Sequence, residues 1–310
     1  MQPYRFKTIG EYHKIMGLPA PAHPLVSVID LESIKQLPDG WLAKIDRSNL
    51  VFDFYNIALK RNLHAKFKYG QQKYDFDEGV MFFMTPSQVF GIKMDESDKK
   101  LHRPTGWTLL IHPDFLWNTS LAKTIHQYQF FGYAANEALM LSEKEETILN
   151  DLIKNLEREY LSNIDDFSKD VMVSQIELLL NYSNRFYNRQ FITRKQTNHD
   201  LLIKFNDLLD DYFDCQNETQ NGLPTVGYLA NKLNISPNYL SDMLRHLTGQ
   251  NAQQHIHNKL IERAKEVLST TSLSVTEISY RLGFEHPQSF SKLFKNKTNV
   301  SPLKFRSSFK

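Results

Sequence analysis

An internal repeat near the C-terminus constrains this chain more than any other feature. The segment that starts at Val226 recurs 49 positions later at Val275, and one inserted residue then shifts the offset to 50. The matched pairs are Leu229 with Ile278, Leu233 with Leu282, Pro237 with Pro287, Leu240 with Phe290, and Leu244 with Phe294. Apolar spacings of three and four residues predict helices, so the repeat predicts two copies of one helical unit.

Each copy has the residues that a helix-turn-helix needs. Ala230 and Ser279 are small side chains at the position where the second helix crosses the first closely. Four positions later stand Asn234 and Gly283, the residue types that best tolerate a positive φ in the turn. A capping residue and a proline then start the second helix in both copies. The apolar face that we expect this helix to bury consists of Leu240, Met243, Leu244 and Leu247, and of Phe290, Leu293 and Phe294.

The opposite face of each second helix is polar and basic. We expect it to contact DNA through Asn238, Ser241, Asp242 and Arg245 in the first copy, and through Gln288, Ser289, Ser291, Lys292 and Lys295 in the second. Short polar and cationic side chains suit base edges and phosphates. An ordinary solvated helix face is the alternative for either helix alone, and the matched turn chemistry of two copies favours DNA binding.

The distribution of charge along the chain also favours a nucleic-acid partner for the C-terminal part. Residues 222–310 hold 12 Lys+Arg and 5 Asp+Glu, whereas the remainder holds 25 and 30, although the whole chain carries only +2. A basic C-terminal module on an acidic body favours a polyanionic partner. Basic surface is also common in proteins that bind no nucleic acid, so charge alone does not decide.

A further helix is predicted between the copies, from Ala252 to about Ser269, with Ile256, Leu260, Ala264, Val267 and Leu268 on its apolar side. Eighteen residues of helix span roughly 27 Å. Successive major grooves on one face of DNA lie about 34 Å apart. One chain is therefore expected to read two grooves about 10 bp apart.

The first part of the chain has a different pattern. Short stretches rich in β-branched and aromatic residues predict strands at residues 50–59, 65–69, 80–84, 88–92 and 108–111. Ser142 and Glu145 form a predicted capping box, and a second helix is expected from Phe167 to about Tyr187. Residues 189–198 are polar and basic and predict a linker, with a short helix at about 200–213.

The C-terminal motifs resemble those of a known family. The stretch Ile278-Ser-Tyr-Arg-Leu-Gly-Phe284, followed by Phe290-Ser-Lys-Leu-Phe294 and Asn299-Val-Ser-Pro302, looks like the signature of AraC/XylS transcription regulators. Residues 260–268 resemble the connecting helix of that family. The resemblance covers residues 223–309. It implies seven helices, two helix-turn-helix subdomains, DNA binding and control of transcription.

The resemblance also assigns roles to individual positions. It places base contacts at Asn238, Ser241, Asp242, Gln288, Ser289, Ser291 and Lys292. Asp242 departs from the basic residue that such regulators often carry there. A carboxylate does not bind phosphate or guanine, but it accepts a hydrogen bond from cytosine N4. Asp242 is therefore expected to add discrimination between bases rather than affinity for DNA, or to contribute nothing.

For residues 1–190 the resemblance implies a cupin-like β-barrel with packed helices, used for sensing and dimerisation. The polar composition that follows predicts a linker region (191–222), and the tandem helix-turn-helix domain takes up residues 223–310. The whole chain is therefore expected to be an α+β protein. The expected partners are double-stranded DNA, RNA polymerase, a second copy of the chain and a small-molecule effector. No ligand-binding residue is assigned.

Several classes of protein are not expected. Cys215 is the only cysteine, so an internal disulfide or a cysteine zinc site is excluded. No apolar run approaches the roughly 18 residues of a membrane span, and the first residues lack the apolar core of a secretory signal. These features predict a cytoplasmic protein without a cofactor.

Two rival functions remain open. One is a cupin-type enzyme with a DNA-binding tail, but His64, His102 and His112 lack the paired His and carboxylate spacing of a cupin metal site. A glycine-rich phosphate loop and a serine elbow are also missing from the sequence. The other rival is a regulator that binds no ligand and whose barrel only dimerises.

Overall fold

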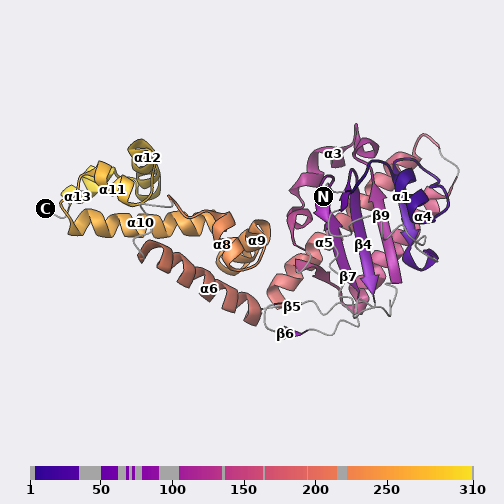
Figure 1. Ribbon diagram of the computed structural model, residues 1–310, viewed down its shortest axis with the longest axis horizontal. Coiled ribbons are helices and arrows are strands. Elements are labelled where there is room, and N and C mark those ends of the chain that lie inside the picture. The colour runs from indigo at the N-terminus through magenta and orange to yellow at the C-terminus, as the bar shows by residue number, and fades with distance from the viewer. Residues whose placement is uncertain are drawn as a thin grey trace. The chain divides into compact units, whose positions relative to one another are not determined.

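The computed structural model describes residues 4–34, 50–61, 68–69, 72–73, 79–90, 105–134, 137–162, 165–193, 195–214 and 222–308. The chain divides into two compact units, Met1–Gln190 and Phe191–Lys310. The first mixes strands and helices, and the second is helical throughout its described part (Figure 1). The expected α+β class with a C-terminal helical region is therefore confirmed. Within the described residues, every helix is too short or too polar to cross a bilayer.

Six described strands of the first unit fall where the β-branched and aromatic stretches predict strands: β3 (Leu50–Phe52), β4 (Tyr55–Arg61), β5 (Lys68–Tyr69), β7 (Val80–Met84), β8 (Val89–Phe90) and β9 (Thr105–Ile111). Four others were not predicted: β1 (Tyr4–Phe6), β2 (Val26–Asp30), β6 (Gln72–Lys73) and β10 (Leu139–Met140). Positions 65–67 and 91–92 of the predicted strands lie outside the described residues. The predicted strand at 50–59 is two strands, because the chain leaves β3 at Asp53 and starts β4 at Tyr55.

The larger sheet is antiparallel and has the order β10-β7-β4-β9-β2. Its central strands lie side by side, with Ile57 opposite both Phe83 and Leu109 (Figure 1). A second sheet has the order β1-β3-β8, and β5 pairs with β6. Among the described strands no sheet closes on itself, since β10 and β2 remain as the two edges. A cupin-like barrel, which requires closure, is therefore not confirmed.

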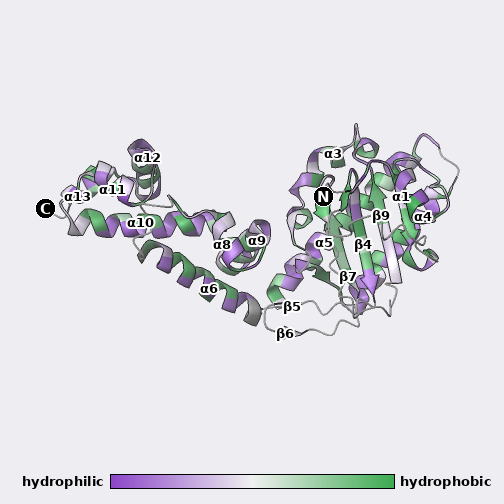
Figure 2. Cartoon of the chain, viewed as in Figure 1, coloured by the Kyte–Doolittle hydropathy of each residue, from purple (hydrophilic) through white to green (hydrophobic). Residues whose placement is uncertain are grey.

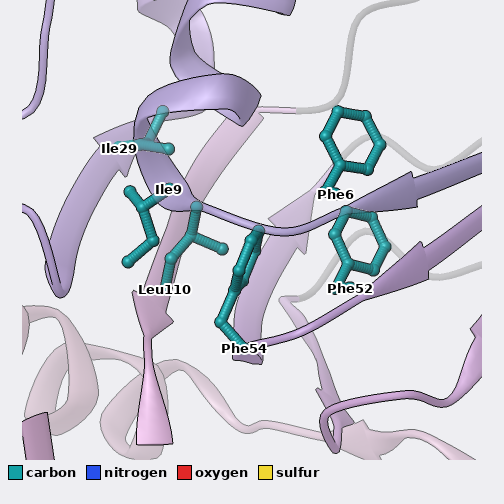
Figure 3. Close-up of a cluster of buried hydrophobic side chains, with 6 residues drawn as sticks. All are labelled: Phe6, Ile9, Ile29, Phe52, Phe54 and Leu110. Carbon is teal, nitrogen blue, oxygen red and sulfur yellow. The ribbon is translucent and has the colours of Figure 1, made fainter. Parts of the chain in front are cut away.

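An apolar cluster joins the two larger sheets and the short helix α1 (Ile9–Ile15). Its buried members are Phe6, Ile9, Ile29, Phe52, Phe54 and Leu110 (Figure 3). The rings of Phe6 and Phe52 stack with centroids 5.2 Å apart. Aromatic side chains therefore fill the space beside the sheet.

Two long helices complete the first unit, α4 (Glu143–Tyr160) and α5 (Ser168–Thr193), beside the single-turn α3 (Ser120–Thr124). The backbone N–H of Ser142 donates to Glu145 Oε2 at 2.9 Å, as the predicted capping box requires. α5 extends six residues beyond the predicted end at Tyr187, and the division between the two units falls inside it, after Gln190.

The helices of the second unit are α6 (Lys195–Asp214), α8 (Val226–Lys232), α9 (Pro237–Thr248), α10 (Ala252–Thr270), α11 (Val275–Arg281), α12 (Pro287–Thr298) and α13 (Pro302–Ser307). Six of them, α8 to α13, lie within residues 223–309, for which the family resemblance implies seven helices, and α6 precedes that range. Figure 2 shows that α6 and α10 carry both hydrophobic and hydrophilic residues, as helices with one buried face do.

The linker predicted at residues 189–198 is wrong. Its described residues belong to the end of α5 and the start of α6, and Phe191 and Asn198 are buried. The amide Nδ2 of Asn198 donates to the carbonyl of Phe191 at 2.9 Å. Polar composition misled the prediction, because the few buried side chains and the hydrogen bond from Asn198 to the backbone of Phe191 hold the described part of 191–198 in the second unit.

Candidate DNA-binding surface

The first helix-turn-helix comprises α8 and α9. Thr225 caps α8, its Oγ1 accepting from the N–H of Tyr228 at 3.1 Å. Asn234 has φ +56°, the left-handed turn conformation that the sequence predicts there. Ser236 then caps α9 through the N–H of Tyr239 at 3.2 Å, and Pro237 is the first helical residue. Local sequence thus specifies both the turn and the start of the recognition helix α9.

The second helix-turn-helix comprises α11 and α12 and repeats this design. Ser274 and Glu277 cap α11 reciprocally, with hydrogen bonds of 2.6 and 3.1 Å. Gly283 has φ +86° in the turn. Pro287 starts α12, although the side chain of His286 makes no capping hydrogen bond. The repeat in the sequence therefore corresponds to two copies of one supersecondary motif.

The inner faces of both recognition helices are packed as expected. Leu240, Met243 and Leu244 are fully buried, as are Phe290 and Phe294. Leu247 and Leu293, also predicted for these faces, are half-buried.

Tyr239 breaks the symmetry of the repeat and was missed. Its counterpart 50 positions later is the exposed Ser289, whereas Tyr239 is fully buried with its ring centroid 5.2 Å from that of Phe191. Aligning the two copies concealed this difference, because it placed Tyr239 at the same outward position as Ser289. A large aromatic side chain at that position was the signal in the sequence that it could be buried.

The outer faces carry the residues predicted to contact DNA. Asn238, Arg245, Gln288, Ser289, Lys292 and Lys295 are exposed, and Ser241, Asp242 and Ser291 are half-buried. Positions 238, 241, 242 and 245 follow a helical stripe, as do 288, 291, 292 and 295. Each recognition helix therefore presents one polar stripe opposite its apolar face. Their contacts with bases remain a prediction.

The two stripes differ in electrostatics. On α9, Arg245 Nη1 lies 2.6 Å from Asp242 Oδ1, and the Asp242 side chain is 13% exposed. On α12, Lys292 and Lys295 lie within ion-pair distance of no carboxylate among the described residues. The cations of α12 are therefore free to meet a polyanion, whereas the guanidinium of α9 is partly neutralised by its own helix.

α10 connects the two motifs as a continuous helix. Its buried residues Ile256, Leu260, Ala264 and Leu268 follow the predicted spacing, with Ile261 buried in addition and Val267 half-buried. Asn251 and Gln254 cap its start reciprocally, each hydrogen bond measuring 2.9 Å. Nineteen helical residues give a strut of about 28 Å.

α6 and the last turn of α5 support the first helix-turn-helix. Phe191 stacks on the imidazole of His246 at 5.0 Å, and Phe205 meets His255 edge-on at 5.7 Å. Burial lowers the pKa of both histidines from the ordinary 6.5. Asp210 of α6 also pairs with Lys259 of α10. α6 and the end of α5 therefore pack against the first helix-turn-helix, although the sequence predicted a linker region at residues 191–222.

The histidines considered for a metal site do not assemble one. His64 and His102 lie outside the described residues. His112 is a cap, its Nδ1 accepting from the N–H of Asp114 at 3.3 Å. Across the described part of the chain, no group of three or more His, Cys, Asp and Glu side chains is placed to hold a metal ion.

Comparison with known proteins relates this surface to other helix-turn-helix domains. A family model described as a helix-turn-helix domain matches residues 229–308, which run from α8 to α13. The match is confined to the C-terminal region, whose motifs resemble those of AraC/XylS regulators.

Two bacterial regulators and one crystal structure illustrate the relationship. The chain is 38% identical over 81 residues to the Msm operon regulatory protein of Streptococcus mutans, covering 26% of this chain and 29% of that protein. The chain thus spans less than a third of that relative. The transcriptional activator RhaS of Escherichia coli O81 is 23% identical over 262 residues, or 82% of this chain and 85% of RhaS. The C-terminal domain of the response regulator yesN from Fusobacterium nucleatum is 30% identical, covering 33% of this chain and 96% of that one, with a TM-score of 0.29.

Proposed function

We propose that this protein is a sequence-specific DNA-binding transcription regulator that inserts α9 and α12 into successive major grooves. The observation that carries the proposal is the pair of outward polar stripes, each on a capped helix that follows a left-handed turn. Phosphate contacts from Lys292, Lys295 and Lys232 would supply affinity, and the short polar side chains would read base edges.

Selection of bound sites from a random duplex library by the full chain tests the proposal. Two enriched blocks about 10 bp apart are expected, because α10 separates the motifs by nearly one helical turn of DNA. One enriched block would restrict base reading to a single motif. Absence of any enrichment, with binding that depends only on salt, would refute sequence-specific recognition.

The first unit would sense an effector on the face of the larger sheet that carries the cluster in Figure 3. β4 places Asn56, Ala58 and Lys60 on one face, with Thr108 opposite Ala58. The buried Oδ1 of Asn56 accepts no hydrogen bond within the described residues, and burial lowers the pKa of Lys60. A small polar molecule that donates to Asn56 would satisfy this atom. A compound that raises the melting temperature of the wild type but not of Asn56→Val would support the site.

The protein would act as a homodimer through the outer face of α5. Phe167, just before the helix, is 73% exposed, and Val171 and Leu178 are 40% and 44% exposed. Spacings of four and seven residues place them on one stripe, beside a surface groove of about 390 Å³. Exposed apolar stripes of this kind mark protein interfaces. Arg185 near the other end and Asp166 and Asp170 near the start suit an antiparallel pairing of two copies.

The same function implies a cytoplasmic location, where promoter DNA and RNA polymerase would be its partners. A cupin-type enzyme is not favoured, since His112, the candidate ligand that the structure describes, serves as a turn cap. The ligand-independent regulator stays as the second candidate, and failure to find any compound that Asn56 recognises would favour it.

A further inference from the structure

One side chain in the first half of α10 contacts the residue that follows the C-cap of α9 and the last turn of α12. Asn258 Nδ2 donates to Gln250 Oε1 at 2.8 Å, and Lys297 Nζ donates to Asn258 Oδ1 at 3.1 Å. Gln250 immediately follows Gly249, the C-cap of α9, and Lys297 lies in the last turn of α12. A single amide thus joins the two helix-turn-helix motifs through their recognition helices.

The chemistry of this bridge requires an amide. Gln250 offers a carbonyl oxygen and needs a donor, whereas the Lys297 ammonium needs an acceptor. Asparagine supplies both groups from one short side chain, aspartate would supply only the acceptor, and alanine neither. Asn258 is half-buried, so its replacement leaves the apolar face of α10 intact.

A second contact also connects the two motifs. A Cβ built on Gly283, in the turn of the second motif, would lie 2.7 Å from the backbone carbonyl of Gly222. The oxygen of that carbonyl accepts from the Tyr212 hydroxyl at 2.8 Å. The backbone that leads into the first motif is therefore packed against the turn of the second.

We propose that Asn258 is a positioning residue that sets the separation of the two recognition helices and thereby selects the spacing of the DNA half-sites. The inference rests on the proposed function. Two helices that are already held at one separation lose little conformational freedom when they bind a DNA site with matching half-site spacing. On a site with another spacing, the protein or the DNA must distort before both helices can bind. One added or removed base pair moves a half-site by about a tenth of a helical turn.

The test uses the full chain and a two-block duplex taken from the site selection. Fluorescence anisotropy gives affinities for this duplex, for duplexes with one base pair added or removed between the blocks, and for a duplex with one block scrambled. For Asn258→Ala we expect about fivefold to tenfold weaker binding to the selected spacing, because two helices that are no longer held must be ordered when the complex forms. Binding to the altered spacings and to the single block should stay within about twofold of the wild type, so that spacing discrimination shrinks.

Two further variants each remove one half of the bridge. Gln250→Ala and Lys297→Gln should each lower spacing discrimination by less than Asn258→Ala does. Asn155→Ala, the same change at an exposed position of α4, is the matched control and should alter no affinity. Equal losses on single-block and two-block DNA for Lys297→Gln would make Lys297 a phosphate contact and overturn its part in the bridge.

The outcomes separate the inference from the function on which it rests. Unchanged spacing discrimination in Asn258→Ala, with wild-type melting behaviour, overturns the positioning role while DNA binding stands. A wild type that selects only one block also overturns it, because no second half-site then needs to be positioned. A wild type that selects nothing refutes the proposed function itself.

Discussion

At the scale of single residues, the two recognition helices use different chemistry on the same framework. α12 presents two lysines without a carboxylate partner among the described residues, whereas α9 pairs its arginine with Asp242. Surface ion pairs contribute little to stability, typically under about 1 kcal/mol. The Asp242–Arg245 pair therefore matters more for what α9 offers to DNA than for the folding of the helix.

Lys292→Ala tests the cationic stripe of α12. If Lys292 reads a base, the variant should lose about 1–3 kcal/mol of binding free energy on the selected site and relax the preference at one position. If it contacts only phosphate, affinity should fall on all sequences and the salt slope should decrease by about one. Titrations at several salt concentrations distinguish these results, and unchanged binding would remove Lys292 from the interface.

Asp242→Ala tests the paired arginine of α9. Loss of the carboxylate removes a negative charge from the DNA-facing helix and releases Arg245 to contact phosphate. We expect tighter binding to non-specific DNA and a salt slope steeper by about one. Unchanged slopes, together with a changed preference at one base pair, would instead assign Asp242 to direct reading of cytosine.

At the scale of elements, α6 is part of the DNA-binding unit. Phe205, Leu209, Tyr212 and Phe213 are buried there, and Phe205 is fully enclosed. Phe205→Ala should cost about 3–5 kcal/mol in the free energy of unfolding of the second unit, measured by urea denaturation. Ile203→Ala, at a 48% exposed position of the same helix, is the control and should cost much less. A loss below about 1 kcal/mol for Phe205→Ala would mean that α6 is only a connector.

The histidines beneath the first motif should make this unit sensitive to acid. Their pKa values are lower in the folded state than the ordinary 6.5, so the folded protein binds fewer protons than the unfolded chain. Stability is therefore fully present above pH 6.5 and falls as the pH drops through 6.5 toward the folded values. His246→Gln with His255→Gln should flatten the dependence of melting temperature on pH, whereas His126→Gln, at an exposed site of the first unit, should not.

At the scale of the whole molecule, the proposed dimer face on α5 determines how many half-sites one assembly reads. Leu178→Arg with Val171→Arg places charges in the apolar stripe and should convert a dimer to a monomer in sedimentation velocity runs. Ile148→Arg, which adds the same charge to a 37% exposed position of α4, is the matched control. A dimer that survives both α5 substitutions would place the interface elsewhere.

The DNA-binding unit was predictable because its determinants are local. Caps, prolines and left-handed turn residues act within a few positions of where they stand, and the apolar spacing of α9, α10 and α12 follows from helical geometry. A repeat doubles that signal. The sequence by itself therefore determined two helix-turn-helix motifs joined by a helix, and the class of partner that their outer faces suit.

Tertiary structure decided what depends on residues far apart in the chain. Local pattern does not reveal the partners that bury Tyr239 under Phe191 or that form the Asn258 bridge. The same is true of the helical conformation of residues 189–193 and 195–198. The strands of the first unit were recognisable one at a time, but their order and the open edges of the sheet were not. Pairing of strands and packing of helices are set by contacts between distant segments, and a single sequence specifies such contacts only through the folded chain.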